Sequence, residues 1–297
     1  MNDRKQHVVK MAHELFINKG FQATSIQDIL DYSGISKGTF YNYFSSKNEL
    51  LMAIFKTIYK DLEKMRDELL IGQDRSDIEI FIKQIEMQLI TNRKNRLIPL
   101  FEEVMVSKDT EIKKFLEQGK LRNIQWIYHR LIDIFGESKK PYLLDCAIMF
   151  MGILRENIKF NRIYNESSAN ISRIVRYSVN RLVNMVEDLS ENKEQLLQPE
   201  LVESWFPNCK KQHYDLNKKI QHIIFLLKNN IGSDKNHIKA KELLEFIEEE
   251  LFGTKSPRQF LIESAILSLK TEHEDEWRKN LTRLEQLLEE YFKLIKD

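Results

Sequence analysis

The sequence predicts an all-α protein, and three observations support this fold class. The chain has 297 residues but only 5 prolines and 9 glycines, so long stretches contain neither helix-breaking residue. Leu, Ile, Glu and Lys are abundant, and apolar residues recur at steps of three and four. With 42% hydrophobic residues, the chain can form a substantial core, and its length suggests two or three domains.

The first helix is predicted over Asp3–Lys19, because its apolar residues fall on one face. Gly20 follows and is expected to end the helix, since glycine adopts the left-handed conformation at little cost. Ser25 and Asp28 form a variant of the capping box and open a second, short helix. The apolar positions of the first helix are Val8, Met11, Ala12, Leu15 and Phe16.

Gly34 breaks the second helix, and Ser36 is expected to cap a third short helix over Lys37–Tyr43. A full capping box, Ser46 to Glu49, then opens a long helix that extends to about Leu70. The pattern is a helix, a helix–turn–helix and a long connecting helix.

Further helices are predicted along the middle of the chain. A polar break at 72–76 precedes Asp77, which is expected to cap the next helix. Pro99 is expected to kink or restart the first of the later helices, and Pro141 stands at a helix entrance. These later helices are predicted at 95–107, 109–135, 141–161 and 168–190.

The polar segment 191–200 ends in Pro199 and is predicted to be a domain boundary. Beyond it, the pattern indicates two stacked helical hairpins, and the apolar group Trp205-Phe206-Pro207 is expected to dock this tail onto the body. The acidic residues between 242 and 250 are interpreted as a solvated helix face. The four helices of the tail are predicted near 211–230, 235–252, 257–270 and 274–296.

Three runs of sequence carry a family resemblance. They are Gly20-Phe21-x-Ala23-Thr24-Ser25-Ile26-x-Asp28-Ile29, then Ser33-Gly34-Ile35-Ser36-Lys37-Gly38-Thr39-Phe40-Tyr41-Asn42-Tyr43-Phe44, then Ser46-Lys47-Asn48-Glu49-Leu50-Leu51. In order and spacing they closely resemble the TetR/AcrR family of transcriptional regulators. The resemblance covers about the first fifty-five residues.

The resemblance implies a domain organisation: a DNA-binding head at 1–50, a ligand-binding and dimerisation body at 51–190, and an extra helical extension at 191–297. It implies a homodimer made by the last two helices of the body, 141–161 and 168–190. It also implies that a small inducer binds within the body and changes the separation of the two heads. The extension is a departure from the family's pattern.

The third helix is the candidate for reading bases, because a recognition helix enters the major groove with its N-terminal residues toward the base edges. Gly38 permits close approach, and Thr39 offers a methyl group and a hydroxyl. Asn42 can pair with adenine or bind a phosphate, and Lys37 can reach a guanine edge or a phosphate. The expected DNA-binding residues are Thr24, Ser25, Ser36, Lys37, Gly38, Thr39, Tyr41, Asn42, Tyr43 and Lys47.

Within this set, Thr24 and Ser25 are expected to attract a phosphate at a helix N-terminus, and Lys47 to clamp one. Arg4 and Lys5 could add a flexible basic arm. Residues 1–60 contain eight Lys and Arg against five Asp and Glu, whereas the whole chain has a net charge of only +1. Any binding of DNA must therefore depend on this local excess.

The body offers an apolar and aromatic set that together could line an inducer site, although ordinary core packing is the preferred interpretation of each single residue. Arg122, Arg130 and Arg155 could pair with an acidic ligand, but a surface charge is the preferred interpretation of each. The expected ligand-lining residues are Met87, Phe101, Met105, Trp126, Phe135, Met149 and Phe150.

Other function classes find little support. The seven histidines form no metal-spaced set, and no HExxH, GxSxG, P-loop or GxGxxG motif is present. Cys146 and Cys209 are far apart and are expected to be idle thiols in a reducing cytoplasm. No apolar run reaches membrane-spanning length. We expect no enzyme activity, cofactor, metal or membrane partner, and a cytoplasmic protein.

The predicted function is a ligand-responsive transcriptional regulator. It is expected to be a repressor that binds an inverted-repeat operator in double-stranded DNA as a homodimer and is released by a small lipophilic inducer. The alternative is a DNA-binding regulator that a protein partner controls through the C-terminal helices.

Overall fold

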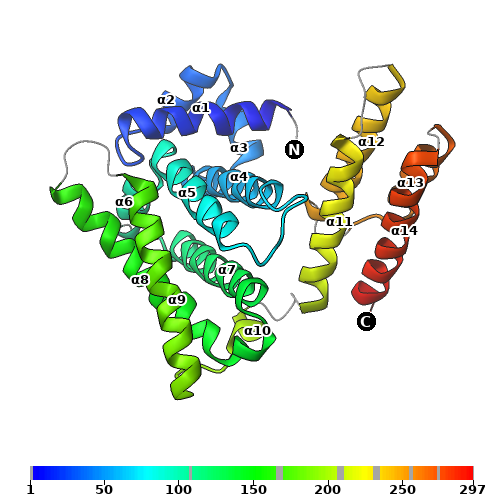
Figure 1. The fold of residues 1–297 in the computed structure, drawn as a ribbon. Helices are drawn as coiled ribbons and strands as arrows, with labels where there is room; N and C mark the ends of the chain where they lie inside the picture. The colour runs from blue at the N-terminus through cyan, green and yellow to red at the C-terminus, as the bar shows by residue number, and fades with distance from the viewer. Residues whose placement is uncertain are drawn as a thin grey trace. The chain divides into compact units, whose positions relative to one another are not determined.

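The computed structural model describes residues 3–106, 109–164, 170–205, 211–229, 235–253, 257–272 and 275–296. Every regular element in these ranges is helical, as the composition predicts (Figure 1). The chain divides into two compact units, Met1–Leu201 and Val202–Asp297. None of the described helices has the length and apolar character needed to span a bilayer.

The N-terminal helices begin and end where the local signals predict. Ser25, Ser36 and Ser46 each accept a hydrogen bond from the backbone amide three residues later, as N-caps do. The long α4 runs without a break from the helix–turn–helix into the rest of the unit. These helices are α1 (Asp3–Lys19), α2 (Ile26–Ser33), α3 (Lys37–Tyr43) and α4 (Lys47–Glu68).

The remaining helices of the first unit also follow their caps. Asp77 and Asp109 cap α5 and α7 through their carboxylates. Pro99 lies in the first turn of α6, where its missing amide breaks no helical hydrogen bond, and the chain restarts at Leu97. The helices are α5 (Ile78–Lys94), α6 (Leu97–Val106), α7 (Thr110–Phe135), the short 3₁₀ helix η1 (Glu137–Lys139), α8 (Lys140–Tyr164) and α9 (Ile171–Asn192).

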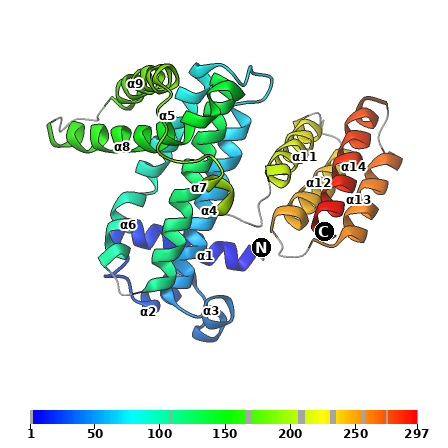
Figure 2. The same cartoon turned by 90° about the horizontal axis from the view of Figure 1, so that it is seen from below.

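One apolar core joins the head to the helices that follow it. It extends from Val8 of α1 through Phe40 of α3 and Phe55 of α4 to Leu100 of α6 and Ile112 of α7. Further along the chain, α8 and α9 lie side by side, and α9 also packs on α5 (Figures 1 and 2). The position of the helix–turn–helix is therefore determined by the same packing that holds the following helices together.

The first unit extends past the end of α9 because Asp145 of α8 binds the segment that follows. Its carboxylate accepts hydrogen bonds from the backbone amides of Leu196 at 2.7 Å and Leu197 at 3.2 Å. The division between the units falls at Leu201, inside the short helix α10 (Leu201–Trp205), which the sequence pattern did not predict. Of the expected apolar docking group, Phe206 and Pro207 lie outside the described residues, as does Cys209.

The second unit is a four-helix arrangement with its own apolar core. Its contacts agree with two stacked hairpins, because α11 packs on α12 and α13 packs on α14. The two hairpins also pack on each other, most extensively through α11 and the last helix, α14, and then through α12 and α13. Between α12 and α13, Arg258 binds the carboxylate of Glu250 through Nε at 2.8 Å and Nη2 at 2.7 Å, and this pair holds the pKa of Glu250 well below its usual range. The helices are α11 (Lys211–Asn229), α12 (Lys235–Gly253), α13 (Gln259–Glu272) and α14 (Asp275–Lys296).

Candidate nucleic-acid interface

The turn that separates α2 from α3 depends on Gly34 and on the cap of α2. Gly34 has a φ of +67°, a left-handed conformation in which a Cβ would be strained, and its amide donates to the carbonyl of Leu30. At the other end of α2, the amides of Ser25 and Asp28 bond to each other's side chains. These two devices determine where α2 begins and ends, and the cap at Ser36 then starts α3.

α3 is anchored by two aromatic rings and exposes its opposite face. Phe40 and Phe44 are fully buried in the core of the unit, with ring centroids 5.9 Å apart. The expected groove-facing residues Ser36, Lys37, Gly38, Tyr41 and Asn42 are exposed, and Thr39 and Tyr43 are half-buried. The structure therefore brings these seven residues together on one exposed helix and its cap.

Gly38 has no evident structural reason to be glycine. It lies in regular helix, and a Cβ built there would meet only the Ser36 Oγ, at an ordinary 3.9 Å. Glycine within a helix is less favourable than alanine by about 1 kcal/mol. Packing within the protein therefore does not require glycine at position 38. The absence of a side chain there leaves space for a partner to approach the backbone closely.

Thr24 is placed differently from the prediction. Its side chain is 1% exposed, and its hydroxyl donates to the Gly20 carbonyl at 2.7 Å, so it stabilises the turn after α1. Ser25 is exposed, but its amide and hydroxyl both donate to the Asp28 carboxylate, which also binds Lys19 at 2.7 Å. Asp28 therefore already supplies negative charge at the start of α2.

Lys47 connects two parts of the head through hydrogen bonds to backbone carbonyls. Its Nζ donates to the carbonyls of Phe21 and Thr24, each at 2.8 Å, and lies 4.4 Å from the centroid of the Phe21 ring. Burial lowers the pKa of this ammonium group. The side chain that was expected to clamp a phosphate thus joins the start of α4 to the turn between α1 and α2.

Replacing Lys47 by alanine is expected to destabilise the head by about 1–3 kcal/mol, because two buried carbonyls would lose a charged donor. DNA affinity should fall to a similar degree for every sequence, since α3 would be held less firmly. Thermal unfolding measured beside DNA binding checks this. An unchanged melting temperature with weaker binding would assign Lys47 to phosphate contact alone.

Arg4 and Lys5 belong to α1 and do not form a flexible arm. The Nζ of Lys5 lies 4.9 Å from the centroid of the Phe44 ring, so this cation stands beside the end of α3. Lys5 thus adds one positive charge to the region of the candidate interface.

The residues expected to line an inducer site fall into separate groups. Met87 and Phe101 pack on the core shared with the head, whereas the rings of Trp126 and Phe150 lie 6.0 and 5.8 Å from the ring of Phe81. Met105 and Met149 are exposed, and Phe135 is half-buried near the end of α7. The helical spacing of these residues correctly predicted which helix faces are apolar. Such spacing does not show whether an apolar face lines a pocket or packs in the core.

A buried polar layer crosses the body where the sequence indicated none. Arg130 is 2% exposed and donates to Gln84 Oε1 at 3.0 Å, to the Arg75 carbonyl at 2.8 Å and to Asp133 at 2.8 Å. Its interpretation as a surface charge was wrong. The guanidinium of Arg66, 7% exposed, lies 4.1 Å from the centroid of the Trp126 ring. Of the other two arginines, Arg155 is exposed and pairs with Glu156.

Cys146 agrees with the interpretation of an idle thiol. It is fully buried in α8, and burial raises its pKa to about 12, so the thiol remains protonated at neutral pH. Among the described residues, no cluster of His, Cys, Asp or Glu has the arrangement of a metal site.

Comparison with known proteins agrees with the geometry of the head. Residues 8–54 match the family of bacterial regulatory proteins described as the tetR family. The HTH-type transcriptional regulator YerO of Bacillus subtilis, itself uncharacterized, is 30% identical over 197 residues, which cover 65% of this chain and 68% of YerO. The HTH-type transcriptional repressor KstR2 of Mycobacterium tuberculosis is 35% identical over 51 residues, which cover 17% of this chain and 26% of KstR2.

The similarity to one relative extends into the second unit. The uncharacterized HTH-type transcriptional regulator YuxN of Bacillus subtilis is 25% identical over 282 residues, which cover 91% of this chain and 92% of YuxN. At least part of the C-terminal region is thus shared with one protein of similar length. No solved structure matched the chain.

Proposed function

Since the chain belongs to the tetR family of bacterial regulatory proteins and is a DNA-binding transcriptional regulator, we propose that it acts as a repressor that binds an inverted-repeat operator as a homodimer and is released by a small lipophilic inducer. The observation that carries this proposal is α3, a helix anchored by Phe40 and Phe44 that exposes residues able to contact bases.

In the proposed complex the start of α3 enters the major groove. Gly38 allows the backbone to approach, the Thr39 methyl group contacts a thymine methyl, and Asn42 pairs with an adenine edge. Lys37 reaches a guanine edge or a phosphate, while Ser36, Tyr41 and Tyr43 position the helix on the sugar-phosphate backbone.

The surface of α8 supports the proposed dimer. Met149, Phe160 and Ile163 lie on one face of this helix and are 39%, 51% and 61% exposed. Tyr177 of the adjacent α9 is 57% exposed. The exposed apolar face of α8, with Tyr177 on the helix packed beside it, is suited to pairing with the same surface of a second subunit.

Two contacts support a path by which a ligand in the body can change the head. Arg96, which precedes α6, donates from Nη1 to the Ile17 carbonyl in the last turn of α1 at 2.8 Å. Glu103 of α6 accepts from the Gln22 amide at 2.9 Å, in the turn that leads to α2. A shift of α6 would therefore pull on both ends of that turn, and a ligand that favours the shifted state would weaken DNA binding.

The proposal is tested by measuring binding to inverted-repeat DNA from the chain's own upstream region at several salt concentrations. Affinity should fall steeply with salt, because phosphate contacts release counterions.

Lys37→Ala should reduce the slope of log affinity against log salt by about one if Lys37 contacts a phosphate. Asn42→Ala should change which sequence is preferred, at a cost of about 1–3 kcal/mol for the correct base. Binding that is insensitive to salt would contradict these roles.

A further inference from the structure

One helix of the second unit has two apolar faces. In the described part of this unit, the large hydrophobic side chains that are exposed all belong to α13: Phe260 is 76% exposed, Leu267 is 65% and Leu261 is 37%. The opposite face of α13 is buried in the core of the unit through Ile262, Ala265, Ile266 and Leu269. A helix that is apolar on both sides is typical of one that is covered on both sides.

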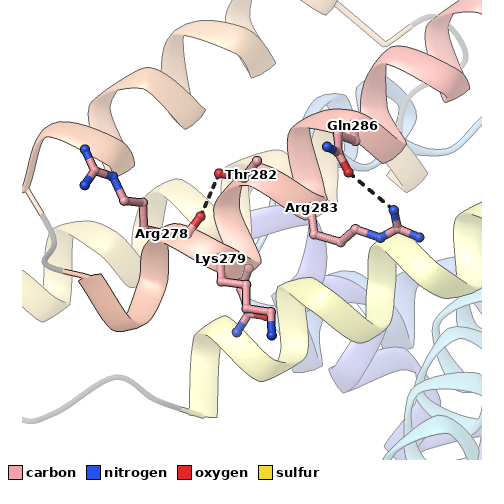
Figure 3. A pocket seen from close by; sticks show the side chains of 6 residues that line it. Arg278, Lys279, Thr282, Arg283 and Gln286 are labelled. Atoms are coloured by element: carbon pink, nitrogen blue, oxygen red, sulfur yellow. Dashed lines mark hydrogen bonds between the residues drawn. The ribbon is translucent and has the colours of Figure 1, made fainter.

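The outward faces of the neighbouring helices are polar. α12 exposes acidic residues, among them Glu242, Glu245 and Glu249. α14 exposes Arg278, Lys279 and Arg283 (Figure 3). Among the described residues of the second unit, the exposed large apolar side chains are thus confined to α13.

The exposed residues of α13 form a stripe that can pair with itself. Phe260, Ser264 and Leu267 follow one another at steps of four and three, so they share one side of the helix in the order large, small, large. An antiparallel pair of such helices would place each Phe260 beside the Leu267 of the other and bring the two Ser264 residues together at the crossing.

The polar groups along the stripe are already satisfied within α13. The Ser264 hydroxyl donates to the Phe260 carbonyl at 2.8 Å. Glu263, at the edge of the stripe, accepts from Gln259 Nε2 at 2.7 Å. Covering the stripe would therefore leave no new unsatisfied donor at Ser264.

We propose that α13 is an interface between two copies of this chain, in which the second units of one homodimer pair antiparallel across Ser264. This inference rests on the proposed function, because it requires the first units to form a dimer. It assigns to the C-terminal helices a second contact within that dimer.

The small size of the stripe favours this tethered partner. An aromatic residue and two leucines supply a few hundred Å² per copy, whereas a stable interface between free proteins buries about 800 Å² on each side. When the first units form a dimer, the second unit of each subunit is tethered near that of the other. Their effective concentration relative to each other is then on the order of millimolar. A contact too weak to form between separate molecules can form under that condition.

Disulfide trapping in the full chain tests the proposal. In a Cys209→Ser background, Ser264→Cys should give a cross-linked dimer as the main product of mild oxidation at micromolar protein, because only close Cα atoms can be bridged. Thr282→Cys on α14 is the matched control, since Thr282 is also exposed and also donates to a carbonyl four residues earlier at 2.8 Å. It should remain at least tenfold less cross-linked. Adding Phe260→Asp to Ser264→Cys should abolish most of the cross-link.

Sedimentation of the reduced protein measures whether it is a dimer. It therefore distinguishes failure of the α13 interface from failure of the proposed dimer. A stable dimer that binds DNA but gives no cross-link at position 264 would overturn the α13 interface while leaving the proposed function intact. That result would point to coverage of α13 by the first unit or by a different protein. Equal cross-linking at positions 264 and 282 would mean random collision and would also overturn it. A monomeric chain would contradict the dimer itself, and the α13 interface with it.

Discussion

Gly38→Ala is expected to lower operator affinity by at least about tenfold while the melting temperature stays the same or rises. The fold has room for the new methyl group, which would meet only the Ser36 Oγ at 3.9 Å. Alanine is also the better helix former, by up to about 1 kcal/mol. A loss of binding must then come from the DNA side, where the methyl group would hold the helix away from the base edges. Each such base contact contributes about 1–3 kcal/mol.

Gly34→Ala is the matched control, because it adds the same methyl group four residues earlier, at another exposed site with open space around it. Gly34 has a φ of +67°, so its substitution should cost about 1–2 kcal/mol of stability. The two variants should therefore separate: Gly34→Ala loses stability, and Gly38→Ala loses DNA binding alone. Fluorescence anisotropy with operator DNA and thermal denaturation measure the two effects. If Gly38→Ala binds DNA as tightly as the parent, α3 does not approach the groove as proposed.

Arg130→Ala is expected to reduce the free energy of unfolding of the first unit by about 3–5 kcal/mol. The substitution removes a guanidinium that is 2% exposed and leaves Gln84, Asp133 and the Arg75 carbonyl without their common donor. The cost arises because the fully buried Gln84 and the Arg75 carbonyl lose a charged donor, whereas Asp133 keeps its ion pair with Arg75. Chemical denaturation, followed by the fluorescence of the tryptophans, measures the change.

Arg155→Ala is the control for this variant, since Arg155 is 71% exposed and pairs with its neighbour Glu156 at 3.0 Å. Its effect should stay within about 0.5 kcal/mol, as is usual for a surface substitution. Equal effects of the two variants would mean that the buried layer contributes no more than an exposed pair does.

The two arginines illustrate what the pattern of residues can predict. Both occur on amphipathic helices and were given the same interpretation, yet one is buried and the other is exposed. Helical periodicity reports which residues share a face, but the partners of a face come from other parts of the chain. The partners of Arg130, at positions 75 and 84, are more than forty residues away, and nothing in the local pattern indicates them.

The DNA head was predicted more completely because its signals are local. The capping serines at 25, 36 and 46 and the glycine at 34 act through hydrogen bonds and backbone angles within a few residues, so their spacing alone determines α2, α3 and the start of α4. The contacts of Lys47 in the same region were not predicted, since its acceptors lie more than twenty residues earlier in the chain. The partner of Thr24 is local, but its burial depends on how the helices pack. The exposure of Tyr41 and Asn42, by contrast, follows from the burial of Phe40 on the same short helix.

The sequence by itself determined that this chain is helical, where its helices begin, and that its third helix has the residues of a DNA reader, because caps, glycines and periodicity act over a few residues. Only the tertiary structure decided that Arg130 is internal, that the lysine at position 47 closes a turn, that the first and last helices of the second unit pair, and that α13 keeps a second apolar face uncovered. These features depend on contacts between residues far apart in the chain, and such contacts form only when whole helices pack against one another.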